Sequence, residues 1–93
     1  METYNGKKLT KAEQKLVSKL VVGTNDETVQ NPLSGYSCKL PALGVALYDF
    51  IIGFTMFYER TMSAPKGVSV AEFDRARYLF LKLWPKEYMG LLD

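Results

Sequence analysis

The sequence predicts an all-α fold, a compact bundle of three long helices plus a short C-terminal helix, with a long loop over residues 24–40. Three observations predict it. Capping boxes of the form S/T-x-x-E begin at Thr10 and Ser69, and Gly23 marks a helix end. Apolar residues also recur at helical spacing in three segments. At 93 residues, the chain is expected to form a single helical domain spanning 1–93.

The first predicted helix follows Thr10, which caps the N3 amide while Glu13 reaches back to the cap amide. One side of this helix is apolar and the opposite side is basic. The apolar residues are Ala12, Leu16, Val17, Leu20 and Val21, and the basic ones are Lys11, Lys15 and Lys19. Gly23 is expected to end the helix, because glycine takes the left-handed C-cap conformation most easily. Upstream, Asn5-Gly6 predicts a tight turn.

Residues 24–40 read as a loop, because Asn31-Pro32 and Ser34-Gly35 interrupt any regular element. A loop of this length is unusual in a small domain, and such loops tend to be functional or disordered. The second helix is expected to begin at Pro41, a favoured first helical position, and to end near Arg60.

The second helix is apolar on two sides when projected at 100° per residue. The broad face contains Leu43, Leu47, Phe50, Ile51, Phe54, Phe57 and Tyr58. A narrower ridge almost opposite contains Val45, Ile52 and Met56, with Tyr48 beside it. Between them runs a stripe of small residues that includes Asp49, which either faces water or meets a charged partner, because a carboxylate is costly to bury alone.

The third helix begins at the second capping box, formed by Ser69 and Glu72. Its predicted core face is Phe73, Ala76, Phe80, Leu83 and Trp84. Pro85 disfavours helix at Trp84 and can begin a new short helix at the C-terminus.

The composition argues against catalysis. The chain has no histidine and a single cysteine, Cys38. It therefore lacks the commonest general base and metal ligand, any Ser-His or Cys-His pair and any zinc ligand set. Nucleotide-binding motifs are also missing. We expect a protein that is not an enzyme, with no catalytic residue, no metal and no cofactor, and Cys38 is expected to be structural.

No basic region leads into an apolar run at the N-terminus, so a cytoplasmic protein is expected. The segment from Leu40 to Tyr58 is long enough to span a bilayer and carries one charge, Asp49. A mid-span aspartate costs about 2.5–3.5 kcal/mol on insertion scales. A single-span membrane protein is therefore ranked third among the possible functions. In the preferred interpretation, no membrane association is expected.

The preferred function is protein binding. So few helices cannot cover both apolar sides of the second helix, and an exposed apolar face usually marks a protein interface. The broad face is assigned to the core, and the narrow ridge to the partner. The predicted partner-binding residues are Val45, Tyr48, Ile52 and Met56. The partner is another protein or a second copy in a homodimer. The competing interpretation is that residues 24–40 fold over the ridge.

The runner-up is a small nucleic-acid-binding regulator. Arg75, Tyr78 and Lys82 share the outer face of the third helix, and the lysines of the first helix could follow phosphates. However, the connection over 61–68 is longer than the turn of a helix-turn-helix motif, and nearby acids dilute the basic face.

Three stretches resemble short uncharacterised accessory proteins of tailed bacteriophages. They are YNGK at 4–7, PALGVALYDFI at 41–51 and FDRARYLFLKLWPKEYMGLLD at 73–93. The resemblance implies a phage-encoded inhibitor or modulator that acts stoichiometrically on a larger host protein, a defence or takeover target, in the host cytoplasm. It brings no catalytic motif, identifies no target and transfers no functional residue.

Overall fold

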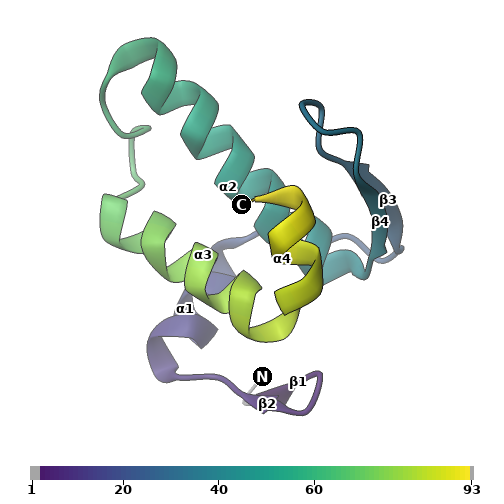
Figure 1. Cartoon of the computed structure of the whole chain (residues 1–93). Helices are drawn as coiled ribbons and strands as arrows, with labels where there is room; N and C mark the ends of the chain where they lie inside the picture. The colour runs from purple at the N-terminus through teal and green to yellow at the C-terminus, as the bar shows by residue number, and fades with distance from the viewer. Residues whose placement is uncertain (1–2, 93) are drawn as a thin grey trace.

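The computed structural model describes residues 3–92 and contains, within that range, four helices and two antiparallel two-stranded sheets (Figure 1). The helices are α1 (Lys11–Lys19), α2 (Ala42–Thr61), α3 (Val70–Leu83) and α4 (Pro85–Leu91). The strands are β1 (Thr3–Tyr4), β2 (Lys7–Lys8), β3 (Glu27–Gln30) and β4 (Ser37–Leu40). The predicted all-α bundle of three long helices is wrong, because the fold is mixed, with 56% helix and two β-hairpins.

Both predicted capping boxes are present. The Thr10 hydroxyl accepts from the Glu13 N–H at 3.1 Å, and the Glu13 carboxylate accepts from the Thr10 N–H at 2.9 Å. Ser69 and Glu72 exchange the same two bonds, each at 3.1 Å. Each box satisfies two amides that would otherwise lack a partner, which explains why α1 and α3 begin where the sequence predicts.

Helix α1 is shorter than predicted and ends at Lys19 rather than at Gly23. Leu20 already has extended backbone, with φ −81° and ψ 148°, and its N–H donates to the Val17 carbonyl at 3.1 Å. The next two residues are β-branched valines, whose stiff side chains favour extended backbone. With nine residues, α1 is not one of three long helices.

Residues 24–40 contain a β-hairpin in place of the predicted loop, because β3 pairs with β4 along its whole length. The turn formers close the hairpin. The Asn31 side-chain oxygen accepts from the Leu33 N–H at 2.9 Å, and Gly35 has a left-handed φ of 79°. Four-residue strands are too short to show a clear alternation of apolar and polar residues, so only the turn residues between them could be recognised in the sequence.

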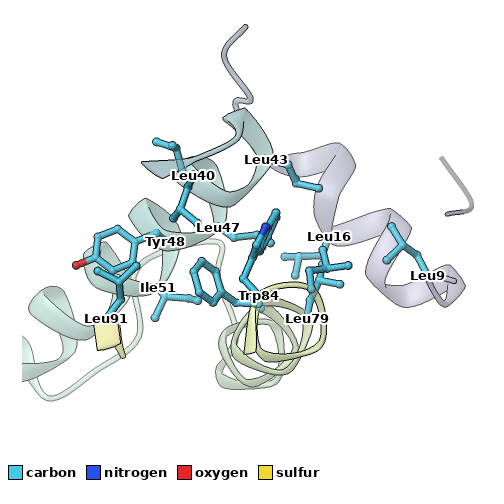
Figure 2. Close-up of a cluster of buried hydrophobic side chains, with 14 residues drawn as sticks. Leu9, Leu16, Leu40, Leu43, Leu47, Tyr48, Ile51, Leu79, Trp84 and Leu91 are labelled. Atoms are coloured by element: carbon cyan, nitrogen blue, oxygen red, sulfur yellow. The ribbon is translucent and has the colours of Figure 1, made fainter. Parts of the chain in front are cut away.

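The core lies where the first half of α2 meets α3 and α4, and α1 and the β3–β4 hairpin cover its sides. Figure 2 shows leucines from several elements converging around Trp84. The predicted core face of the third helix is confirmed for most of its members, because Ala76, Phe80, Leu83 and Trp84 are buried. Phe73 is half-buried.

Two ion pairs attach α1 to α3. Lys19 pairs with Glu72, and Lys82 Nζ lies 2.8 Å from Glu13 Oε1. Lys82 also donates to the Lys8 carbonyl at 3.0 Å. Burial raises the pKa of the Glu13 carboxyl, but hydrogen bonds from Lys82 and the Thr10 amide outweigh it and leave the pKa lowered. The Glu13 carboxylate therefore stabilises the fold, because it links the start of α1 to α3 through Lys82.

Candidate protein-binding surface

The structure divides the predicted partner-binding ridge of α2 into a buried and an uncovered part. Val45 is 9% exposed and Tyr48 is 7% exposed, and both belong to the core cluster. Ile52 is half-buried against that cluster, and Met56 is 55% exposed. The four residues therefore do not form one continuous surface.

The β3–β4 hairpin explains why the start of the ridge is buried. Both strands contact α2, and the Tyr48 hydroxyl donates to the Gln30 carbonyl at 3.3 Å. The competing interpretation, in which residues 24–40 cover the ridge, therefore applies to Tyr48, and Val45 is buried beside it in the core cluster. In this structure these two side chains are covered by the chain itself.

Large apolar side chains are exposed instead around the last turns of α2, on more than one side of the helix, and at the start of α3. We call this the distal surface, and it consists of Met56, Phe57, Tyr58, Met62 and Val70, all of which are exposed. Figure 1 shows that the C-terminal end of α2 reaches away from the β3–β4 hairpin and from α4. Phe57 and Tyr58 were assigned to the internal broad face, and their exposure corrects that assignment. Exposure of several large apolar side chains at one end of a fold is typical of an interaction site.

A groove between α2 and α3 adjoins the distal surface and encloses about 320 Å³. We call it the α2–α3 groove. Its apolar lining is Phe54, Tyr58, Val70 and Phe73, and its acidic lining is Glu59 and Asp74. A second groove, of about 270 Å³, lies on the other side of Phe54, between α2 and the segment after it, and includes Asp49, Phe57 and Pro65. Asp49 is exposed there, so the small-residue stripe faces water.

Stacked aromatic rings form the floor of the α2–α3 groove. The Phe54 ring lies 4.3 Å from the Phe73 ring and 6.2 Å from the Tyr58 ring, measured between centroids. Arg77 lies over the far side of this row, 5.7 Å from the Phe73 centroid, and donates to the Tyr88 hydroxyl at 3.0 Å. These contacts hold the rings in place, so the groove is largely formed before anything binds.

The sequence analysis did not identify Val70, Phe73, Glu59 and Asp74 as members of a surface. The difference in length between α2 and α3 could have indicated this surface. Helix α2 has 20 residues and spans about 30 Å, whereas α3 has 14 residues and spans about 21 Å. The shorter helix cannot cover the longer one along its whole length. An aromatic run at the end of the longer helix is then the segment left exposed.

The predicted nucleic-acid face does not form a continuous basic surface. Lys82 is engaged by Glu13 and by a backbone carbonyl. Tyr78 is exposed and lies in a shallow depression beside Arg75, but Glu13 and Asp74 line the same depression. Two carboxylates therefore border the place where phosphates would have to bind, which weakens attraction to a polyanion.

The remaining chemistry-bearing groups show no assembled site. Burial and the Glu87 carboxylate raise the pKa of the Cys38 thiol, so the thiol stays protonated near neutral pH and is a weak nucleophile. Within residues 3–92, no three acidic, cysteine or histidine side chains gather closely enough to hold a metal ion.

Helix α2 is long and apolar enough to cross a membrane by length and composition, with a mean hydropathy of 1.3 over its best window. This is weak support for a membrane span, because core helices of soluble proteins pass the same test. Leu43, Leu47 and Ile51 of α2 are buried in the core. A membrane-spanning α2 would have to give up those contacts.

No protein-family model matches this chain, and no curated protein or solved structure matches it either. The resemblance to bacteriophage accessory proteins therefore stays a hypothesis. The function is inferred from the chain's own surface.

Proposed function

We propose that the protein is a small non-catalytic accessory protein that binds another protein through the distal surface. The observation that carries this proposal is the exposure of several large apolar side chains around the last turns of α2 and at the start of α3. Burying them against a partner removes apolar area from water, at roughly 25 cal/mol per Å². Aromatic residues and methionine, which make up most of the distal surface, are enriched at protein interfaces.

The resemblance to phage accessory proteins adds an expectation about the partner. A larger host protein in the host cytoplasm would be bound stoichiometrically, and its inhibition or modulation would be the biological outcome. A chain with one small core and a formed apolar surface suits that role, because binding needs no reactive group.

The alternative, a nucleic-acid-binding regulator, draws on another part of the molecule. Lys7, Lys8, Lys11 and Lys15 are all exposed on β2 and α1. Phosphate contacts made by such lysines would weaken steeply as salt increases, whereas an apolar contact would not. The salt dependence of partner binding therefore separates the two functions.

Two matched variants test the proposal. Met56 on the distal surface and Met89 on α4 are 55% and 62% exposed, so Met56→Glu and Met89→Glu place the same charge at equally accessible positions. Tagged wild type, Met56→Glu and Met89→Glu are each used to capture proteins from host lysate treated with nuclease. We expect proteins retained by wild type and Met89→Glu to be lost from Met56→Glu, with all three chains equally helical. Equal capture by both variants, or capture that disappears at moderate salt, would contradict the proposal.

A further inference from the structure

The walls of both grooves beside the distal surface carry acidic residues and no basic residue. Glu59 and Asp74 line the α2–α3 groove, and Asp49 lines the groove on the other side of Phe54. The chain as a whole has a net charge of +2, so the absence of lysine and arginine from both linings is not a consequence of overall composition. The linings of both grooves are therefore apolar and acidic.

These three carboxylates have no cationic partner within the part of the chain that the structure describes. The two ion pairs there involve Glu13 and Glu72, and neither includes Asp49, Glu59 or Asp74. All three side chains are exposed. They are therefore available to pair with positive charges on a bound molecule, which would steer its approach and set its orientation.

The walls of the α2–α3 groove also restrict the kind of segment that can bind. Both walls are helices, so the groove offers no free strand edge. A bound segment must be held through side chains. An amphipathic helix does this by inserting apolar residues spaced three or four apart into a hydrophobic groove.

The groove is short and has room for the apolar side chains of about one turn of such a helix. Along α2 the lining extends from Phe54 to Glu59, and along α3 from Val70 to Asp74, so each wall is a little more than one turn long. The stacked rings of Phe54, Tyr58 and Phe73 are already in place, which lowers the entropic cost of binding.

We infer that the α2–α3 groove binds a basic amphipathic helix of another protein. Its apolar residues pack on Phe54, Tyr58 and Phe73, and its flanking lysine or arginine residues pair with Glu59 and Asp74. This inference rests on the proposed function, to which it adds the chemistry of the partner.

The probe is a displayed library of random helical peptides, selected on the immobilised wild-type protein. We expect the enriched peptides to carry apolar residues at helical spacing with an excess of lysine and arginine. Their affinity is then measured on the double variant Glu59→Lys/Asp74→Lys and on the control Asp26→Lys/Glu27→Lys. The control changes exposed carboxylates before and at the start of β3 and alters the net charge equally.

Binding to the groove variant should weaken at least about tenfold, as for charges that face one another across an interface, while the control binds like wild type. The peptide affinity of the neutral double variant Glu59→Gln/Asp74→Asn should lie between those of the other two variants. This result would show that the weaker binding follows the charge and is not caused by misfolding of the charge-reversed variant. Neutral or acidic peptides, equal binding to both reversed variants, or no enrichment at all would overturn the inference. So would a wild-type dimer at micromolar concentration that Glu59→Lys/Asp74→Lys dissociates, because a second copy would then be the occupant.

The outcomes also separate this inference from the proposed function. Partner capture that is lost in Met56→Glu but kept in Glu59→Lys/Asp74→Lys would leave the protein-binding function standing and refute the basic helix. Capture that is insensitive to both changes would refute both.

Discussion

Truncating Trp84 to alanine is expected to remove a large share of the stability of this protein. The indole is 7% exposed, and its ring lies 5.4 Å from the Phe80 ring and 5.8 Å from the Tyr4 ring. It also reaches α2, because its tip lies 3.3 Å from where a Cβ on Gly44 would be. One side chain therefore joins the N-terminal hairpin, α2 and α3.

Removing a buried aromatic side chain typically costs about 3–5 kcal/mol. At about 0.05–0.15 kcal/mol per residue, a chain of this length has a free energy of unfolding of roughly 5–14 kcal/mol. Trp84→Ala should therefore lose at least about a fifth of the stability, and in the lower part of that range most of it. Urea unfolding should be followed by circular dichroism, because Trp84 is the only tryptophan and fluorescence would lose its probe.

The control is Trp84→Phe, which keeps a ring in the site and should lose less stability. If the free energy of unfolding of Trp84→Ala lies within about 1 kcal/mol of the wild-type value, the indole does not pack as described. The arrangement of α2, α3 and the N-terminal hairpin around it would then be wrong.

Three further outcomes are expected. A Cβ at Gly90 would lie 2.4–2.6 Å from the Tyr36 ring, so Gly90→Ala should cost about 1–3 kcal/mol in thermal unfolding, and adding Tyr36→Ala should recover part of it. Folding lowers the pKa of the Glu13 carboxyl. Its contribution to stability is therefore complete above the pKa of the unfolded chain, about 4.3, and is lost as the pH falls through the lower pKa of the folded protein. The stability difference between wild type and Glu13→Gln, which keeps the cap, should shrink over that acidic range, and a constant difference would contradict the pairing with Lys82. Ile52→Glu should lower stability by about 1–3 kcal/mol, because Ile52 is half-buried against the core, and unchanged melting would place it at the surface.

The parts of the fold that could be predicted from the sequence depend on contacts between residues close in the chain. The capping boxes at Thr10 and Ser69 are local hydrogen bonds, and both were placed correctly. The burial of Trp84 followed from helical spacing and the proline after it. These features need no knowledge of the tertiary arrangement.

The parts that were missed depend on contacts between residues far apart in the chain. The β3–β4 hairpin has short strands, and a hairpin this small gains much of its stability by packing on other elements. The ridge of α2 was assigned to a partner in preference to cover by residues 24–40, and Tyr48 is buried because the β3–β4 hairpin formed by those residues packs against α2. The groove members Val70 and Asp74 became neighbours of α2 only through the pairing of α2 with α3.

Hydrogen exchange, measured on the protein alone and with a captured partner, tests most directly whether the distal surface binds protein. Binding there should slow exchange of amides over 54–62 and 70–74, with little change in α1 and in the β3–β4 hairpin. Protection confined to residues 7–19 or to 27–40, with none at the end of α2, would contradict the proposed function.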